Sequence, residues 1–207
     1  GILTNVTYPS MAGTSGPRDF IELPSQLLEH WASEPEVLKS FAKHYETGES
    51  IPDELIEKIL KASKFNQGFI NTEYLAASLL DMDWHTISHT DPIKDSNEFE
   101  KVSLEKIGLI DEIAPRYRST YFAHIFSGGY SSGYYSYVHA AVLDSDGFEA
   151  FKEAGDVFDP ELSTKLRKTI YEKGSTEEAM DLFVNFRGRK PIIAPLLKVR
   201  GLDGSSG

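Results

Sequence analysis

The feature that most limits how this chain can fold is a series of apolar stretches with helical spacing, bounded by residues that start or stop helices. Residues 37–45 carry Val, Leu, Phe and Tyr at that spacing, between Ser-Glu-Pro-Glu at 33–36 and Gly48. Ser and Glu three residues apart can cap a helix start, Pro suits a first turn, and Gly often ends a helix. We therefore expect a helix that starts within residues 33–36 and ends at Gly48.

The same pattern recurs along most of the chain. A second helix is expected to open at Ser50 or Pro52, and a longer one after Gly68, each with one buried face. The apolar residues that define these faces are Leu55, Ile56, Ile59 and Leu60 in the first, and Tyr74, Leu75, Leu79 and Met82 in the second. Residues 89–97 are polar and contain Asp-Pro, which predicts a loop before a shorter helix at about 99–107.

Two further helices are expected towards the end of the chain. Asp159-Pro160 predicts the start of a helix that Gly174 stops, and a second capping box at 175–178 predicts a helix that leads to Gly188. The fold class is therefore mainly α. We expect one domain over residues 1–203, with an irregular loop at 1–19, helices over 20–203, and a tail at 204–207.

Composition limits the partners and the chemistry. Thirty-two acidic and 21 basic residues give a net charge of -11, which repels a phosphate backbone, so we expect no nucleic-acid partner. The chain has no apolar run of about eighteen residues and no signal-peptide pattern at its start, which predicts no membrane partner and a cytoplasmic location. Because cysteine is absent, a transition metal would need His and carboxylate ligands.

Residues 124–137 combine histidine, glycine and tyrosine in an unusual way. Tyr130, Tyr134 and Tyr137 are spaced i, i+4 and i+7, on one stripe of a helix, and Gly128 and Gly129 permit close backbone approach. Phenol hydroxyls are neutral donors at pH 7, suited to an oxyanion or a peptide carbonyl. The alternative is a helix packed on amphipathic aromatic residues, with the glycines forming only a turn.

Two other sets of residues are candidate metal ligands. Glu22 and Glu29 lie seven residues apart, so they would share a helix face, although Glu22 alone is also typical of a solvated first-turn carboxylate. His85 and His89 have the i, i+4 spacing of a zinc-binding helix. They lack the Glu after the first His and fall at a helix end, so we expect surface or capping histidines there.

The chain resembles the zinc metallopeptidases of peptidase family M3, which include thimet oligopeptidase, oligopeptidase A and bacterial dipeptidyl carboxypeptidase. Residues 8–14 and 18–26 are similar to the stretch that follows the HExxH helix of that family. Residues 122–130 and 133–137 are similar to its glycine-rich loop and tyrosine helix over the substrate cleft. The resemblance extends over nearly the whole chain, and residues 186–202 are most similar to the peptidyl-dipeptidase branch.

The resemblance implies roles for particular residues. Glu22 matches the third zinc ligand, and Glu29 is a hypothetical support for a ligand His. His124, Tyr130 and Tyr137 match residues that stabilise the tetrahedral intermediate and are expected to be catalytic. Gly128, Gly129 and Tyr134 are expected to bind substrate.

For the whole protein, the resemblance implies part of a zincin-like catalytic domain with a substrate channel and zinc as cofactor. The implied activity is hydrolysis of short peptides, with release of C-terminal dipeptides. Short peptides and the remainder of the parent polypeptide are the expected partners.

One departure from the family pattern is large. No HExxH motif occurs among the six histidines, so two zinc ligands and the general base are missing. We expect this chain to be a C-terminal part that follows the metal-binding helix and is inactive alone. The alternative is a non-catalytic helical module or an inactive homologue. An independent zinc enzyme that uses His85 and His89 would lack a base and a regular helix.

Overall fold

The computed structural model describes residues 1–92 and 95–204. These residues form helices joined by turns, and within them the extended backbone pairs only at an isolated bridge between Lys43 and Ser50. The chain divides into two compact units, residues 1–65 with 138–207, and residues 66–137. The prediction of a mainly α fold is confirmed.

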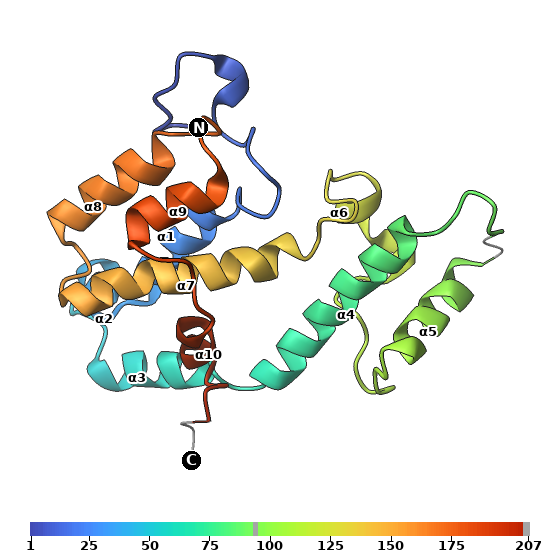
Figure 1. Cartoon of the computed structure of the whole chain (residues 1–207). Helices are drawn as coiled ribbons and strands as arrows, with labels where there is room; N and C mark the ends of the chain where they lie inside the picture. Colours follow the sequence, from blue (N-terminus) through green and yellow to red (C-terminus); the bar gives the residue numbers. More distant parts are fainter. Residues whose placement is uncertain (93–94, 205–207) are drawn as a thin grey trace. The chain divides into compact units, whose positions relative to one another are not determined.

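The first unit contains most of the helices, which are labelled in Figure 1. They are η1 (Pro9–Met11), α1 (Leu23–Ser33), α2 (Pro35–Phe41), α3 (Asp53–Ala62), most of α7 (Ser136–Ala154), α8 (Pro160–Leu166), the π-helical η3 (Arg167–Tyr171), α9 (Ala179–Arg187) and α10 (Ala194–Arg200). The core forms where α1, α7 and α9 bring together fully buried side chains, among them Leu27, Phe151 and Phe183. Burial of such side chains is the main favourable contribution to folding.

Several predicted boundaries in this unit are confirmed. α3 begins directly after Pro52, and α8 begins after Asp159, whose carboxylate accepts the N–H of Leu162 at 2.7 Å. Gly188 ends α9 with a φ of +80°, a left-handed conformation that costs glycine little. Local signals were sufficient at these positions because each acts within one turn of the helix.

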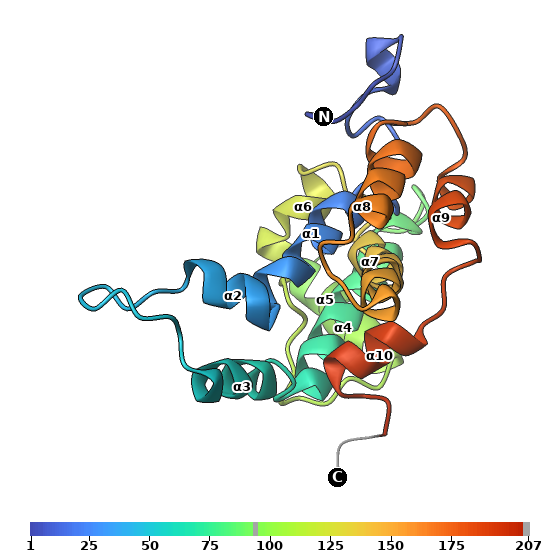
Figure 2. The ribbon, with the colours of Figure 1, turned by 90° about the vertical axis from the view of Figure 1, so that its left-hand side faces the viewer.

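The helix predicted to continue to Gly48 ends instead at Phe41. The chain then makes a turn in which the N–H of His44 donates to Glu49 at 2.7 Å and the N–H of Ile51 donates to Ala42 at 2.9 Å. Figure 2 shows this loop extending away from α2 and α3. Tyr45 is 89% exposed, so a longer helix would have buried no additional apolar face there.

Neither predicted capping box forms. Ser33 is the last residue of α1, and its hydroxyl donates to the carbonyl of His30, while Glu34 takes the N-cap position of α2. The hydroxyl of Ser175 donates to Met11 at 3.3 Å, and Glu178 takes the N-cap position of α9. In both cases the serine finds another acceptor, an alternative that the four-residue pattern does not reveal.

The second unit contains α4 (Gln67–His85), α5 (Ser96–Lys106), η2 (Ser119–Tyr121), α6 (Ala123–Phe126) and the first two residues of α7. α4 and α5 lie side by side (Figure 1). Both helices were predicted. The predicted loop at 89–97 and the predicted tail at 204–207 include residues 93–94 and 205–207, which lie outside the described residues.

The predicted buried faces are only partly correct. In α4, Leu75, Leu79 and Met82 are 38–48% exposed, whereas Leu80 and Asp81 are fully buried. In α3, Ile56 is buried, while Leu55, Ile59 and Leu60 are 36–47% exposed. The buried side of α4 also carries Ala76, Ala77 and Ser78, so a rule based on large apolar residues selected the wrong side.

We predict that Leu80→Ala destabilises the second unit by about 2–5 kcal/mol, because it leaves a cavity in a fully buried site. The matched variant Leu79→Ala is expected to cost less than about 1 kcal/mol, since Leu79 is 46% exposed. Denaturant unfolding followed by the fluorescence of Trp84, in a Trp31→Phe background, measures both values in this unit. Equal costs for the two variants would contradict the assignment of the buried face.

A buried carboxylate anchors the segment after α9 to α7. Asp146 is fully buried and accepts two hydrogen bonds of 2.6 Å from the guanidinium of Arg189, and one of 3.1 Å from the N–H of Ile192. Arg187 donates to the same carboxylate at 3.2 Å and forms a bidentate pair with Glu153. This pairing raises the pKa of Arg187 and lowers that of Glu153, mainly through their hydrogen bonds to each other.

Removal of this anchor is expected to destabilise the first unit. Asp146→Ala should cost about 3–5 kcal/mol, since it leaves the guanidinium groups without their buried counter-charge. Glu149→Ala, on the same helix, removes only a more exposed pair with Lys198 and should cost at most about 1 kcal/mol. Denaturant unfolding followed by Trp31 fluorescence, in a Trp84→Phe background, tests the difference, and similar costs would argue against the anchor.

Candidate functional site

The glycine-rich segment makes a tight turn after α6. A Cβ atom on Gly128 would lie 2.9 Å from the Cα of His124 and 3.0 Å from its carbonyl oxygen, closer than real Cβ contacts. Gly129 has a φ of +80°, in the left-handed region that favours glycine. The N–H of Tyr130 then donates to the carbonyl of His124 at 2.9 Å. The two glycines therefore allow the chain to fold back on His124.

The prediction of one helical tyrosine stripe is wrong. α7 begins at Ser136, so Tyr137 is helical, whereas Tyr130 and Tyr134 lie in the loop before it. The left-handed backbone of Ser132, with a φ of +53°, does not permit a regular helix over that spacing.

The rings nevertheless come together. Tyr130 stacks on Tyr137 with ring centroids 5.0 Å apart, and Tyr134 lies 5.5 Å from Tyr137. The ring of His124 is 6.1 Å from Tyr130, 5.5 Å from Tyr134 and 6.3 Å from Tyr137. The loop between α6 and α7, rather than one stripe of a helix, thus brings the four predicted side chains together.

Three further rings belong to this group, although the sequence analysis assigned none of them to the site. Tyr74 of α4 stacks on Tyr134 at 5.0 Å, Tyr117 lies 5.1 Å from His124, and Phe122 lies 4.8 Å from Tyr134. Tyr74 had been assigned only to an apolar helix face, and Tyr117 carried no motif. The seven rings of Tyr74, Tyr117, Phe122, His124, Tyr130, Tyr134 and Tyr137 form what we call the aromatic cluster.

Members of the aromatic cluster differ in their access to solvent. Tyr134 is 2% exposed, whereas His124, Tyr130 and Tyr137 are half-buried, and Gly128 and Gly129 are exposed. His124, Tyr130 and Tyr137 can therefore present polar atoms to a ligand more readily than Tyr134 can. The substrate contact expected of Tyr134 stays a prediction.

Burial raises the pKa of two phenols of the cluster, Tyr134 and Tyr74. It raises the pKa of Tyr134 to about 12, an effect that the neighbouring Tyr117 increases and the guanidinium of Arg116 opposes. Burial also raises the pKa of Tyr74. Arg116 itself pairs with Glu73 at 3.3 Å. Burial lowers the pKa of Arg116, but the neighbouring Tyr134, Tyr117 and Glu73 raise it by more. At neutral pH the phenols of Tyr74 and Tyr134 are hydrogen-bond donors, not anions.

The other predicted site residue, Glu22, belongs to the first unit. It occupies the N-cap position of α1, is half-buried, and its Oε2 accepts the hydroxyl of Ser25 at 3.0 Å. α1 is attached to α7 through Asp144, which accepts from Gln26 at 3.0 Å and lies 2.7 Å from His30. Glu29 is exposed on the same helix and lines a hollow of about 240 Å³ with His30 and Asp144.

The histidine pair at the end of α4 does not form a metal site. The Nδ1 of His85 lies 2.8 Å from the carboxylate of Asp81, and His89 is exposed in the turn that follows. Across the part of the chain that the structure describes, no three His, Asp or Glu side chains gather in a way that could hold a metal ion. The expected capping and surface histidines are found: the Nδ1 of His85, the last residue of α4, hydrogen-bonds the main-chain carbonyl of Asp81 at 2.9 Å, and His89 is exposed.

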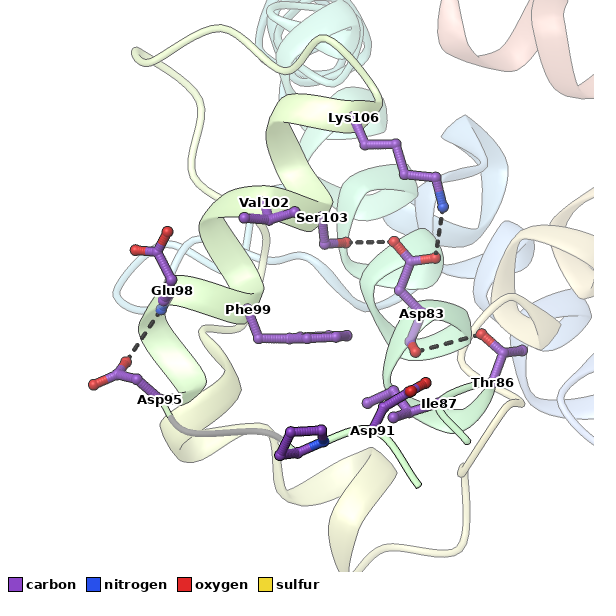
Figure 3. Close-up of a pocket in the computed structure, with 11 residues that line it drawn as sticks. Asp83, Thr86, Ile87, Asp91, Asp95, Glu98, Phe99, Val102, Ser103 and Lys106 are labelled. Atoms are coloured by element: carbon purple, nitrogen blue, oxygen red, sulfur yellow. Dashed lines mark hydrogen bonds and ion pairs between the residues drawn. The ribbon is translucent and has the colours of Figure 1, made fainter. Parts of the chain in front are cut away.

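A separate hollow of about 570 Å³ lies between the end of α4 and α5 (Figure 3). Its apolar lining consists of Ile87, Pro92, Phe99 and Val102. The carboxylate of Asp83 at its edge already accepts hydrogen bonds from the hydroxyl of Ser103 at 2.8 Å and from the Nζ of Lys106 at 3.2 Å. The lining residues include none of the predicted site residues.

Comparison with known proteins identifies the family of this chain, because the family model that matches residues 1–202 is that of Peptidase family M3. The chain belongs to this family. Dipeptidyl carboxypeptidase of Escherichia coli is 42% identical over 204 residues, which are 98% of this chain and 30% of that protein. Oligopeptidase A of the same organism is 37% identical over 209 residues, again 98% and 30%. The chain thus spans about 30% of the length of these relatives.

The probable cytosolic oligopeptidase A of Arabidopsis thaliana is also similar, with 37% identity over 191 residues, which are 91% of this chain and 27% of that protein. Within residues 1–92 and 95–204, no helix has the length and apolar content needed to cross a membrane.

The raised pKa of Tyr134 makes the free energy of unfolding depend on pH in the alkaline range. Because the folded-state pKa of about 12 exceeds the ordinary value of 10.0, the stabilisation is complete below pH 10 and is lost as the pH rises towards 12. The stability difference between wild type and Tyr134→Phe should therefore fall by about 2 kcal/mol between about pH 9 and 11.5. Denaturant unfolding at each pH measures it, with the exposed Tyr45→Phe as control; a constant difference would contradict the shift.

Proposed function

We propose that this chain is part of a zinc-dependent peptidase of short peptides, in which it supplies one metal ligand and the donors that stabilise the reaction. The observation that carries the proposal is the convergence of His124, Tyr130 and Tyr137 beside an exposed glycine turn. Membership of Peptidase family M3 supports the reaction class. The proposal concerns the whole protein, of which relatives suggest that this chain is a part.

The chemistry assigned to the aromatic cluster is hydrogen bonding to developing negative charge. Attack on a peptide carbonyl moves charge to its oxygen, and donors already held in place stabilise that charge without reorganisation. The hydroxyl of Tyr130 or Tyr137 and the imidazole of His124 are the proposed donors. The turn at Gly128 and Gly129 has no side chains to obstruct a peptide backbone, which supports the proposed substrate contact there.

Glu22 is the proposed zinc ligand of this chain. Its carboxylate is half-buried, and a carboxylate oxygen is a suitable donor for zinc. The other ligands would be two His side chains from the remainder of the parent polypeptide, and the described residues of this chain contain no group of three His, Asp or Glu side chains that could hold a metal ion. When bound, zinc would polarise the carbonyl or a water molecule. Glu29, exposed on the same helix, is proposed to orient one of those His ligands.

The proposed substrate class is short peptides, with release of C-terminal dipeptides. Support comes from the name dipeptidyl carboxypeptidase of the relative at 42% identity, against 37% for oligopeptidase A. Because these two identities are similar, the position of cleavage has to be determined from the products that the enzyme releases.

The test compares this chain with the same chain extended upstream by its own encoded residues, on an N-blocked short peptide. We expect dipeptide release by the extended chain alone, abolished by a chelator and restored by zinc. Tyr130→Phe in the extended chain should lower kcat by about a hundredfold to a thousandfold, because it removes one donor to the oxyanion. Mass spectrometry of the products and initial rates provide the measurements.

The matched control is Tyr135→Phe, which removes a phenol of the same loop that is not a member of the aromatic cluster. Cleavage at internal bonds instead of dipeptide release would contradict the proposed release of C-terminal dipeptides but would still support zinc-dependent peptide hydrolysis. Absence of activity in an extended chain that also lacks HExxH would support a non-catalytic module.

A further inference from the structure

The loop that carries Tyr130 and Tyr134 is held by one buried carboxylate of α4. Asp81 is fully buried, its Oδ1 accepts the N–H of Ser132 at 3.0 Å, and its Oδ2 accepts the N–H of Tyr134 at 2.9 Å. The Nδ1 of His85, one turn later, lies 2.8 Å from Oδ1. The hydrogen bond that the Nδ1 of His85 makes is to the main-chain carbonyl of Asp81, at 2.9 Å. A carboxylate removed from water requires hydrogen-bond donors, and here both hydrogen bonds to the Asp81 carboxylate come from backbone groups of the loop.

The conformation of the loop depends on these contacts. Ser132 has a φ of +53°, which a residue with a side chain adopts only at a cost. Backbone N–H groups in a turn of this kind form a concave site for an anion, and Asp81 provides that anion from within the protein. The carboxylate thus offsets the cost of the turn that separates Tyr130 from Tyr134.

α4 holds Tyr134 at both of its backbone groups. The N–H of Tyr134 donates to Asp81, and its carbonyl accepts the hydroxyl of Tyr74 at 3.3 Å. Tyr74 and Asp81 are seven residues apart, two turns of one helix, so they face the loop from the same side. Towards α6, the hydroxyl of Ser131 donates to the carbonyl of Ile125. The loop is therefore fixed between two helices.

We propose that Asp81, supported by His85, is a positioning residue that sets where Tyr130 and His124 present their donors. Neither residue touches the proposed substrate; each acts through the loop backbone. This inference rests on the proposed function for its catalytic consequence, but not for its structural one.

The structural arm uses this 207-residue chain. In Asp81→Asn the amide retains one acceptor oxygen, so one of the two loop N–H groups loses its partner. Hydrogen exchange at Ser132 and Tyr134 should accelerate, while exchange in α5 stays unchanged. The control Asp83→Asn, on the same helix but bound to Ser103 and Lys106, should leave the loop unaffected. Exchange that rises evenly through α4, α5 and the loop would overturn positioning in favour of a general stability role.

The kinetic arm uses the extended chain. Asp81→Asn should lower kcat by about tenfold to a hundredfold with little change in KM, because misplaced donors weaken the transition state more than substrate binding. In a Tyr130→Phe background the same substitution should have a much smaller effect, since Asp81 acts through that side chain. Full additivity of the two substitutions, or unchanged kcat in an active enzyme, would overturn the proposal.

His85→Gln provides a second, milder variant if Asp81→Asn fails to fold. It should reproduce the same pattern of exchange and kcat with smaller amplitude, and an absence of both effects would remove His85 from the proposal. If the extended wild-type chain cleaves no peptide, the proposed function fails, whereas the exchange data still decide how the loop is held.

Discussion

A carboxylate that leaves water requires hydrogen-bond donors, and in this chain that requirement fixes the loops to the helices. The most buried acids are Asp81, Glu100, Asp144 and Asp146, all on helices. In the second unit, Glu100 accepts the N–H of Ser119 at 2.6 Å, and Asp81 accepts two N–H groups of the loop before α7. In the first unit, Asp146 binds the segment after α9. Leaving any of these acids unmatched would cost more than the bonds contribute, so the loop positions are strongly specified.

Sequence patterns were sufficient to locate most of the helices, but they did not identify the buried faces correctly or place every helix end. Helical spacing located α3 and α4 because the signal lies within a few residues. α5 was expected after a polar loop, and α9 was expected from a capping box that does not form, although Gly188 does end it. The buried side of α4 was chosen wrongly because Leu75 and Leu79 are more apolar than Asp81, yet Asp81 is the buried residue. Its burial depends on donors 51 and 53 residues further along the chain, which no local pattern contains.

The candidate site shows the same division between local and distant information. His124, Tyr130 and Tyr137 could be selected from residue type and from the family resemblance, although the i, i+4, i+7 spacing suggested a helix that does not form. The spacing was misleading because Ser132 leaves the right-handed region. Tyr74 and Tyr117 were missed because their contacts with Tyr134 and His124 span long stretches of sequence. Residue type and resemblance thus selected these three side chains, whereas only the fold identified the rings that surround them.

The proposed activity places opposite demands on the two kinds of polar group. A carboxylate ligand binds a metal ion as an anion, and Glu22 is half-buried at the start of α1, where the helix dipole favours negative charge. Donors to an oxyanion have to carry a proton, and a phenol such as that of Tyr130 or Tyr137 is a neutral donor at pH 7. An acid within the aromatic cluster would accept hydrogen bonds that the reaction needs. Asp81 avoids this conflict because a backbone N–H group of the loop already donates to each of its two oxygens, so its carboxylate can shape the loop without competing for the proposed donors.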